Sequence, residues 1–216
     1  MEKQVILIDD HELFRQGLKN CIEQNSDWKV IKDAGDFAGA GKISLELAME
    51  NLENRNIIAI IDLSFKNIGQ SEENLIGFEI AKVFRKNAPF VKCLILSSFD
   101  SCGYVEKALS AEVGALGYVS KSADKKTIVL ALETVSKNQK FIQQELVSNL
   151  LQLKDLYSSF TNKEREVADL ITATNTNAEI AEKMNIKVAT VDNYISRLYD
   201  KTGTTSRTEL LRQLGR

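Results

Sequence analysis

The sequence predicts an α/β domain built on a parallel five-stranded sheet with helices on both faces, followed by a smaller all-α unit of four short helices. Two observations carry this prediction. In the first half, short apolar runs alternate with amphipathic helical patterns, and runs that are apolar throughout are typical of strands covered on both faces. After about residue 159 the strand pattern stops, and helix start and stop signals recur at short intervals.

The strands are expected where short apolar runs end abruptly at polar residues. These runs are Val5–Ile8, Ile57–Ile61, Cys93–Leu96 and Leu116–Val119, with a weaker one at Trp28–Ile31. Helical patterns lie between them, and the clearest places Ile128, Leu132 and Val135 on one face of a helix. This alternation of strand and helix favours βαβ units, which produce a parallel sheet.

Capping signals mark the helices of the C-terminal unit. Thr161 and Glu164 have the Thr-x-x-Glu spacing of a capping box, and Ser206 with Glu209 opens the last helix in the same way. Asn177 is expected to cap the second helix, because asparagine is favoured at that position.

The third of these helices is expected to begin near Val188 and to stop at Gly203, a residue type that often ends helices. Its buried face is predicted to carry Val191, Ile195 and Leu198. A tight turn joins it to the helix before it, so the two form a helix-turn-helix unit.

These patterns divide the 216 residues into a first domain over residues 1–138, a linker over 139–158 and a second domain over 159–216. The three cysteines lack a metal or redox spacing and there is one histidine, so a zinc site is not expected. No secretory signal precedes Asp9, and no apolar run approaches the ~20 residues of a membrane span. We therefore expect a soluble cytoplasmic protein without a membrane partner.

Polar residues follow the carboxyl ends of four predicted strands, which is where parallel α/β sheets bind their ligands. They are Asp9, Asp10, Asp62, Ser97 and Lys121. Three carboxylates at one edge repel one another, and a divalent cation removes that repulsion. Mg²⁺ prefers carboxylate and water oxygens, so the pattern predicts a Mg²⁺ site. The alternative is a set of solvated strand ends, which are common in α/β proteins.

Asp62 is the residue expected to react. It ends the central apolar run, and carboxylates are known to attack phosphorus and form aspartyl phosphates. Lys121 would pair with the phosphoryl oxygens, and Ser97 would hydrogen-bond one of them. The sequence contains no G-x-x-x-x-G-K loop for nucleotide phosphates, so the chain is not expected to be an enzyme in its own right.

Motifs related to one known family occur in both halves of the chain. They are Val5–Leu18, Leu94–Ser97 and Gly117–Lys121 in the first domain and Phe160–Val167, Asn177–Ala181, Thr190–Ile195 and Lys201–Leu210 in the second. By these motifs the chain resembles the NarL/FixJ-type response regulators, whose DNA-binding domain is of the LuxR type. The resemblance implies a flavodoxin-like receiver phosphorylated by a sensor histidine kinase. It also implies a two-component transcription factor that forms a homodimer on activation and binds an inverted repeat of DNA.

The resemblance assigns a role to each acidic residue of the predicted site. It makes Asp62 the phosphoacceptor and a Mg²⁺ ligand. Asp10 would bind Mg²⁺ directly, and Asp9 would bind it through water. The backbone carbonyl of Ser64 would be a further ligand.

The resemblance also names the residues expected to respond to the phosphoryl group. Ser97 and Tyr118 would be the switch pair, and Lys121 the phosphate-binding lysine. The chain departs from the family by three longer segments: around Gly35–Gly41, over residues 63–76, and between Ser97 and Lys121. All three segments adjoin the predicted site, so they are expected to change the loop geometry around it.

The outward face of the third helix in the second domain is expected to meet DNA. Asn193 suits a bidentate contact with adenine, and Arg197 and Lys201 can reach phosphates. Asp192 stands where the family usually has lysine; a carboxylate repels phosphate but can accept a hydrogen bond from a cytosine amino group. The full set of expected DNA-binding residues is Ala189, Thr190, Asp192, Asn193, Ser196, Arg197, Lys201 and Arg207.

Two hypotheses for the function follow from these patterns. The first is a transcription factor gated by phosphorylation of Asp62. The second is a phosphorylation-independent receiver scaffold that binds a partner protein and has weakened DNA binding. Under the first hypothesis the last helix, with Leu210, Leu211 and Leu214 on one face, is the expected contact between two DNA-binding domains.

Overall fold

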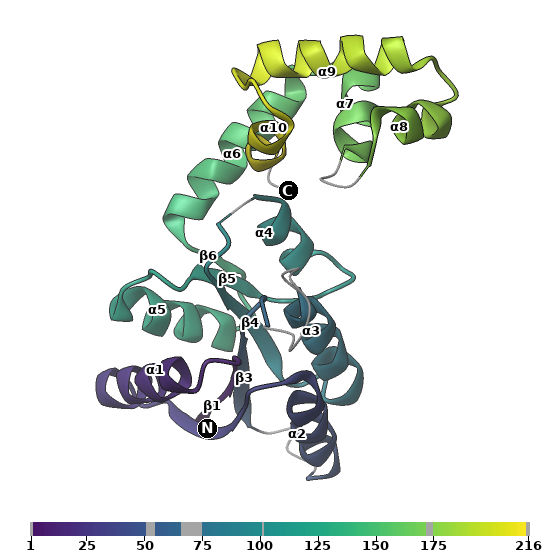
Figure 1. Ribbon diagram of the computed structural model, residues 1–216. Helices are drawn as coiled ribbons and strands as arrows, with labels where there is room; N and C mark the ends of the chain where they lie inside the picture. The colour runs from purple at the N-terminus through teal and green to yellow at the C-terminus, as the bar shows by residue number, and fades with distance from the viewer. Residues whose placement is uncertain (1, 51–54, 66–74, 101, 172–174, 215–216) are drawn as a thin grey trace. The chain divides into compact units, whose positions relative to one another are not determined.

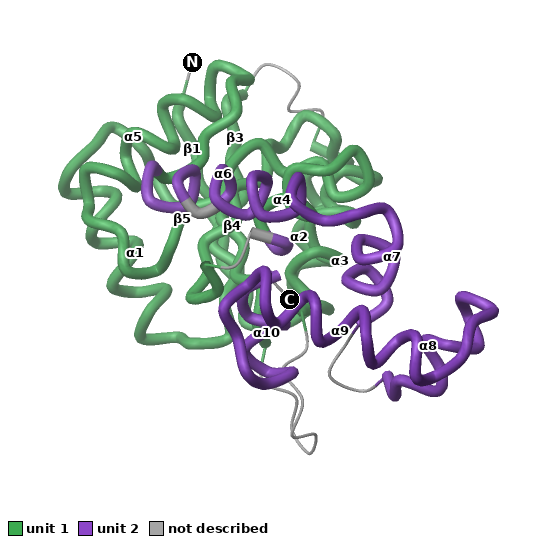
Figure 2. Tube along the Cα trace, turned by 90° about the horizontal axis from the view of Figure 1, so that it is seen from above, with its two compact units in different colours: residues 1–100, 105–143 green, residues 101–104, 144–216 purple. Residues whose placement is uncertain are grey.

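The computed structural model describes residues 2–50, 55–65, 75–100, 102–171 and 175–214. The chain divides into two compact units, which Figure 2 shows in different colours. The first comprises residues 1–100 and 105–143, and the second comprises residues 101–104 and 144–216. Every helix within the described ranges is too short or too polar to span a bilayer.

The first unit contains a six-stranded sheet with the order β2-β1-β3-β4-β5-β6, in which all neighbouring strands are parallel. The strands are β1 (Lys3–Ile8), β2 (Lys29–Ala34), β3 (Asn56–Ile61), β4 (Lys92–Ser97), β5 (Gly117–Ser120) and β6 (Phe141–Ile142). The five expected strands are confirmed. The sequence does not signal β6, because two residues are too few to give a pattern; it pairs with Gly117 and Tyr118 of β5.

The strand order creates a binding edge at the carboxyl ends of β1 and β3. The chain steps outward from β1 to β2 and then returns across β1 to β3, so the order reverses between these two strands. Ligands of open parallel sheets bind at such a reversal. β1 and β3 pair in register, with Ile8 opposite Ile61, so the residues that follow them start side by side.

Helices cover both faces of the sheet, as predicted (Figure 1). They are α1 (Glu12–Asn25), α2 (Phe37–Met49), α3 (Ile76–Asn87), α4 (Cys102–Leu109) and α5 (Lys125–Ser136). α1 and α5 pack together on one face, and α2 and α3 pack together on the other. The predicted buried face of α5, with Ile128, Leu132 and Val135, is confirmed.

Of the three segments that are longer than in the related family, the first two differ in what the structure describes. Around Gly35–Gly41 the chain turns into α2, and the carboxylate of Asp36 caps that helix by accepting a hydrogen bond from the Gly39 N–H. Such a cap satisfies one of the unpaired N–H groups at a helix start. The second segment falls mainly on residues 66–74, which lie outside the described residues.

Within its described residues, the second unit contains helices joined by short connections and no strand. Its helices are α6 (Gln144–Ser158), α7 (Asn162–Leu170), α8 (Asn177–Met184), α9 (Val188–Thr202) and α10 (Arg207–Gln213). α6 occupies most of the segment expected to be a linker. The helices α7 to α10 are the four predicted from the capping signals.

The caps explain where these helices begin. Thr161 and Glu164 form the expected capping box at the start of α7. The prediction for Asn177 is wrong: Thr176 caps α8 and forms another capping box with Glu179, so Asn177 is the first helical residue. This Thr-x-x-Glu signal is present in the sequence, and it prevails over a lone asparagine because it satisfies two N–H groups instead of one.

The core of the second unit confirms one predicted face and contradicts another. The expected inward side chains of α9 are buried: Val191, Ile195 and Leu198. The leucines of the last helix are buried in the same core: Leu210, Leu211 and Leu214. The predicted contact between two copies through these leucines is therefore wrong, because their side chains pack inside their own unit.

Candidate functional site

The carboxyl ends of four strands bring the predicted receiver residues to one edge of the sheet. Asp62 follows β3, and its N–H donates to the carbonyl of Ile8 (2.8 Å), which keeps it level with Asp9 at the end of β1. On the other side, the Lys121 N–H donates to the Ser97 carbonyl (2.8 Å), which aligns the ends of β4 and β5. Strand pairing alone therefore brings together the residues that the sequence patterns predict to form one site.

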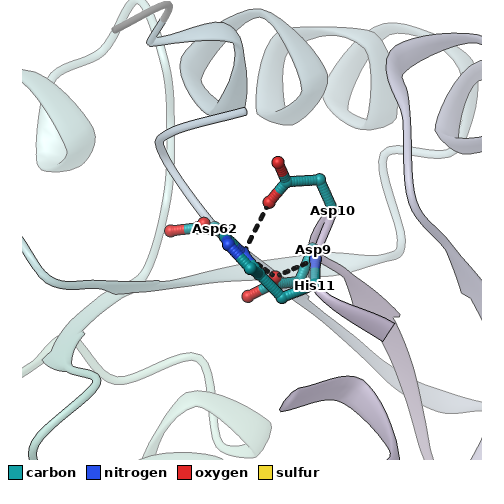
Figure 3. A group of neighbouring side chains, drawn as sticks. All are labelled: Asp9, Asp10, His11 and Asp62. Carbon is teal, nitrogen blue, oxygen red and sulfur yellow. Dashed lines mark hydrogen bonds and ion pairs between the residues drawn. The ribbon is translucent and has the colours of Figure 1, made fainter. Parts of the chain in front are cut away.

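Three carboxylates and an imidazole converge at this edge, as Figure 3 shows. Asp9, Asp10, His11 and Asp62 each offer one ligand atom, and these atoms all lie within 4.8 Å of one another. His11 Nδ1 lies 2.8 Å from Asp10 Oδ1 and 3.3 Å from Asp9 Oδ1. Carboxylate oxygens are the ligands that Mg²⁺ prefers, so the residues fit the expected cation.

Lys121 supplies the positive charge that balances Asp9 and Asp62, the two most buried carboxylates at this edge of the sheet. Its Nζ lies 2.7 Å from Asp9 Oδ2 and 2.8 Å from Asp62 Oδ2. The ammonium also lies 4.7 Å from the centre of the Phe14 ring, a distance at which the ring face attracts a cation. The lysine expected to bind phosphate is thus held against Asp62 before a phosphoryl group arrives.

Burial controls the protonation of Asp62. The residue is 3% exposed, and burial raises the pKa of its carboxyl by more than the hydrogen bond from Lys121 lowers it. The neighbouring Asp9 carboxylate raises this pKa further. Burial also disfavours the Lys121 ammonium, but its hydrogen bonds to Asp62 and Asp9 outweigh this and raise the pKa of Lys121. The Asp62 anion is therefore destabilised by its site, and a bound cation would relieve that destabilisation.

Phe99 connects the two expected switch residues. Ser97 is fully buried, and its hydroxyl accepts a hydrogen bond from the Phe99 N–H (3.2 Å). Tyr118 is also fully buried, and its hydroxyl donates to the Phe99 carbonyl (2.7 Å). A change at Ser97 can therefore reach Tyr118 through the backbone of one residue.

The first turn of α3 packs directly against the backbone that carries Asp62. The Gly77 N–H donates to the Leu63 carbonyl (3.1 Å). A Cβ at position 77 would lie 2.6 Å from the Leu63 Cα and would collide with the Asp62 carbonyl oxygen. Glycine is the residue type without that atom, so this close approach depends on Gly77.

In the second unit, α9 presents the predicted DNA-facing side chains to solvent. The exposed residues on this face are Ala189, Asp192, Asn193, Ser196 and Arg197. Thr190 is half-buried, and the Arg197 guanidinium lies 5.9 Å from the centre of the Tyr194 ring. These side chains are accessible to a ligand, and their contact with DNA stays a prediction.

Asp192 has a hydrogen-bond partner that the sequence patterns do not reveal. The side-chain amide of Asn177 donates to Asp192 Oδ1 (2.7 Å), and Asn177 Oδ1 accepts from Arg207 Nη1 (2.9 Å). The three residues join α8, α9 and α10 on the surface of the unit. Through the amide, the Arg207 charge polarises the bond to the carboxylate and partly balances it.

Lys201, an expected phosphate contact, takes part in an ion pair inside the unit. Its Nζ lies 2.7 Å from Glu164 Oε2 and 2.7 Å from the Ser159 carbonyl oxygen. Glu164 is buried, and its Oε2 also accepts from the Thr161 N–H (2.7 Å). Lys201 therefore holds α7 and α9 together, and its contact with DNA stays a prediction.

Two family models match the chain over most of its length. Residues 5–133 match the response regulator receiver domain, and residues 158–214 match the luxR family of bacterial regulatory proteins. The chain belongs to the response regulators. It joins a receiver to a LuxR-type DNA-binding domain, which is the organisation of the NarL/FixJ-type transcriptional regulators.

Curated response regulators are similar to this one over almost its whole length. The DNA-binding transcriptional activator DevR/DosR of Mycobacterium tuberculosis is 28% identical over 213 residues, which cover 95% of this chain and 91% of the relative. The transcriptional regulatory protein LiaR of Bacillus subtilis is 28% identical over 213 residues, covering 95% and 93%. A solved structure of two RcsB dimers bound to two parallel DNAs superimposes with a TM-score of 0.66 at 21% identity, over 99% of this chain and 98% of that one. The likeness to RcsB shows a shared fold.

The sequence patterns do not predict three contacts at the sites of this response regulator. His11 faces the carboxylates, Phe99 joins the switch residues, and Asn177 holds Asp192. His11 directly follows the acidic pair, so its position was a usable signal. Phe99 makes these contacts through its backbone N–H and carbonyl, so its residue type does not indicate them. The role of the Ser64 carbonyl as a cation ligand stays a prediction.

Proposed function

We propose that this response regulator is a cytoplasmic transcription factor gated by phosphorylation of Asp62 by a sensor histidine kinase. The observation that supports it most is the setting of Asp62, a buried carboxylate paired with Lys121 and grouped with Asp9 and Asp10. Solvated strand ends would have separate, exposed side chains. A convergent set of one lysine and three carboxylates, of which Asp9 and Asp62 are buried, favours a phosphoryl-transfer site instead.

The proposed cation is Mg²⁺, held by the carboxylates of Asp9, Asp10 and Asp62 and by the backbone carbonyl of Ser64. When bound, it would neutralise negative charge on the incoming phosphoryl group. Mg²⁺ usually keeps several water ligands, so this small set of protein oxygens is sufficient.

Asp62 would act as the nucleophile. One of its carboxylate oxygens attacks the phosphorus of a phosphohistidine on the kinase. A new O–P bond forms, the P–N bond breaks, and the histidine nitrogen keeps the electron pair and takes up a proton. Lys121 then shifts a hydrogen bond from Asp62 to the phosphoryl group, a short movement because its Nζ is already 2.8 Å from Asp62 Oδ2. Positioning and charge balance supply most of the catalysis in such transfers.

Ser97, Phe99 and Tyr118 would carry the signal away from Asp62. When the Ser97 hydroxyl turns to bond a phosphoryl oxygen, it weakens its bond to the Phe99 N–H. The Phe99 backbone can then move, together with the carbonyl that accepts from Tyr118. A buried hydroxyl that loses its acceptor is destabilised by about 1–3 kcal/mol, so the Tyr118 side chain is expected to move as well.

The second domain would convert this change into DNA binding. α9 is the proposed recognition helix, because its exposed face carries Asn193 and Arg197. One short helix reads few base pairs, so we propose a homodimer on an inverted repeat with half-sites about one helical turn, ~10 base pairs, apart. The proposed domains are the receiver over residues 1–138, the linker over 139–158 and the DNA-binding domain over 159–216.

Intact mass after incubation with acetyl phosphate and Mg²⁺ tests the proposal. The wild type should gain the mass of one phosphoryl group, and Asp62→Asn should gain none. The matched control is Asp124→Asn, which removes another receiver carboxylate at the N-cap of α5, where asparagine is equally suitable. The control should be labelled like the wild type. Labelling of Asp62→Asn at the wild-type level would overturn the assignment.

A second candidate is a phosphorylation-independent scaffold with weakened DNA binding. Two observations favour it: the Asp192 carboxylate on the DNA-facing surface, and the engagement of Lys201 with Glu164. Mg²⁺-dependent binding of beryllofluoride, a phosphoryl mimic, separates the candidates. Binding supports the gated transcription factor, whereas a folded protein that does not bind supports the scaffold.

A further inference from the structure

A concave pocket lies at the end of the sheet opposite Asp62, and we call it the basic pocket. Its volume is about 870 Å³, within the size range of small-molecule sites in proteins. The amino ends of β3 and β4 and the segments before β5 and β6 line it. Asp62 follows the carboxyl end of β3, so the basic pocket is separate from the phosphoacceptor site.

Four positively charged side chains line the basic pocket. They are Arg55, Arg85, Lys92 and Lys140. Among the described residues that line it, none carries a carboxylate. The whole chain has a net charge of −2, so this concentration of positive charge is local. A concave wall of one sign focuses the electric field and attracts ions of the opposite sign.

Lys92 is half-buried in this wall and bonded to neutral groups. Its Nζ donates to the Ser136 carbonyl (2.6 Å) and to Asn56 Oδ1 (3.1 Å). Burial lowers the pKa of Lys92, and these neutral partners do not reverse the effect. An anion in the pocket would stabilise the ammonium, because an opposite charge within ~4–6 Å favours the charged form.

Part of the positive charge has a structural explanation. α3 and α5 end beside the pocket, and the C-termini of helices attract cations. Arg85, in the last turn of α3, donates to the Ala111 carbonyl. Arg55 and Lys140 differ, since both lie outside helices and are exposed. The described residues offer neither of them a hydrogen-bond or ion-pair partner, so their charges remain available to a ligand.

The basic pocket also has an apolar wall. Phe90 and Leu116 are half-buried and line it beside the cations. An aromatic face suits the stacking of a nucleic acid base, whichever base it is. Cations for phosphates and an aromatic ring for a base correspond to the two ends of a nucleotide.

We propose that the basic pocket binds a nucleoside polyphosphate, with its phosphates among Arg55, Lys92 and Lys140 and its base against Phe90. Arginine and lysine bind phosphate oxygens through charge-assisted hydrogen bonds, which are about twice as strong as neutral ones. The nucleotide would be a second ligand of the receiver. Its binding does not depend on the proposed phosphorylation of Asp62.

Isothermal titration of the full chain with ATP in EDTA, at constant ionic strength, tests this proposal. EDTA removes Mg²⁺, so the carboxylates around Asp62 repel the nucleotide and cannot imitate the site. The wild type should show saturable binding at one site, and Asp62→Asn should bind equally well. Replacing Arg55 and Lys140 together by alanine should weaken binding at least tenfold, about 1.4 kcal/mol.

The matched control replaces Lys125 and Lys126 by alanine. This double variant removes the same charge from exposed positions of α5, outside the pocket, and should bind ATP like the wild type. Equal weakening in both double variants would overturn the proposal, because it would show non-specific attraction. A wild type without saturable binding would overturn it as well.

A ligand without a base tests the apolar wall. Phe90→Ala should weaken the binding of ATP and leave that of inorganic triphosphate unchanged, because triphosphate lacks the ring that stacks on Phe90. Unfolding temperatures of the variants should equal that of the wild type. If Phe90→Ala affects both ligands equally, or neither, the assignment of the base to this wall is wrong.

Discussion

Asp192 carries the most unusual charge on the proposed DNA-facing surface, and its carboxylate accepts a hydrogen bond from a neighbouring side chain. It accepts from the amide of Asn177, which in turn accepts from Arg207. A hydrogen bond to a charged group contributes about 1.5–3 kcal/mol when sheltered and less at an exposed position such as this. A phosphate or a base edge can therefore compete with Asn177 for the position of this side chain.

Replacing Asp192 by lysine should tighten binding to every DNA sequence. If residue 192 lies near a phosphate, the substitution removes a repulsion and adds a contact, which steepens the log–log salt dependence by about one unit. Fluorescence anisotropy with a specific and a random duplex at two salt concentrations measures both effects.

The control is Asp200→Lys, which makes the same charge change at another exposed position of α9. An equal gain in DNA affinity in both variants would show that the added positive charge, and not its position, accounts for the effect. If the Asp192 variant binds the random duplex more tightly but the specific one more weakly, by about 1–3 kcal/mol, Asp192 reads a base and the phosphate assignment is wrong.

Glu164 is a buried charge, and its contribution to the free energy of unfolding depends on pH. It is 2% exposed, with Lys201 Nζ 2.7 Å from its Oε2. Burial acts to raise the pKa of this carboxyl, but hydrogen bonds from Lys201 and Thr161 outweigh it, so the pKa of Glu164 lies below its usual 4.5. Because the folded-state pKa is the lower one, the ionised pair stabilises the fold fully above that usual value. The contribution is lost as the pH falls through the lowered pKa.

Glu164→Gln should therefore lower the free energy of unfolding at pH 7 and have much less effect at pH 3. Urea unfolding followed by far-UV circular dichroism at both pH values measures this difference. Circular dichroism is needed because the single tryptophan, Trp28, lies in the first unit. A loss of the same size at both pH values would show that packing, and not the charge, accounts for the effect.

At the scale of the elements, the start of α3 packs closely against Asp62 and Leu63, which directly follow β3. Gly77→Ala should destabilise the receiver and slow the labelling of Asp62 together, because the added Cβ meets backbone atoms that cannot turn aside. Overpacking of this kind destabilises by about 1–3 kcal/mol. Trp28 fluorescence during unfolding and the rate of mass gain with acetyl phosphate measure the two effects.

The control for this substitution is Gly17→Ala in α1. No atom lies within 4 Å of a Cβ built at Gly17, and alanine in a helix interior is more stable than glycine by roughly 0.5–1 kcal/mol. The two variants should therefore change stability in opposite directions. Wild-type stability and labelling in Gly77→Ala would contradict the importance of this packing.

Strand ends are the part of the site that sequence patterns predict well. Apolar runs show where strands stop, and parallel pairing then requires Asp9, Asp62 and Lys121 to meet at one edge. The bond from Tyr118 to the Phe99 carbonyl depends on backbone positions that periodicity does not encode. The stripe Leu210–Leu214 shows the remaining difficulty, since an apolar helix face looks the same whether it packs on its own unit or on a second copy.

At the scale of the whole molecule, the two units have separate hydrophobic cores, and the chain passes from the last segment of the first unit into α6 at residues 143–144. Gln143 is the last residue of this segment before α6. Its N–H donates to the Tyr118 carbonyl (3.2 Å), and its Oε1 accepts from the Ser120 N–H (2.9 Å). The strand that carries the expected switch tyrosine is thus bonded to the residue that precedes α6.

Inserting Gly-Ser-Gly-Ser between Gln143 and Gln144 should uncouple the two units. A flexible insert cannot transmit a small displacement of β5 to α6. Phosphorylation measured by intact mass should be unchanged, while the gain in DNA affinity on phosphorylation, measured by anisotropy, should disappear. A variant that keeps the gain would show that coupling runs by another route.

The two edge strands of the sheet also affect the tendency of the protein to aggregate. An open edge strand offers unpaired N–H and C=O groups to which strands of other molecules can add. β6 covers β5 at Gly117 and Tyr118 but is itself only 2 residues long, and the opposite edge, β2, exposes Lys29 and Asp33, whose charges discourage such addition. Proteolytic cleavage before Phe141 would therefore do more than separate the two units. The released receiver would lose the strand that covers β5. The exposed edge of β5 would then be a template for the pairing of strands from other molecules.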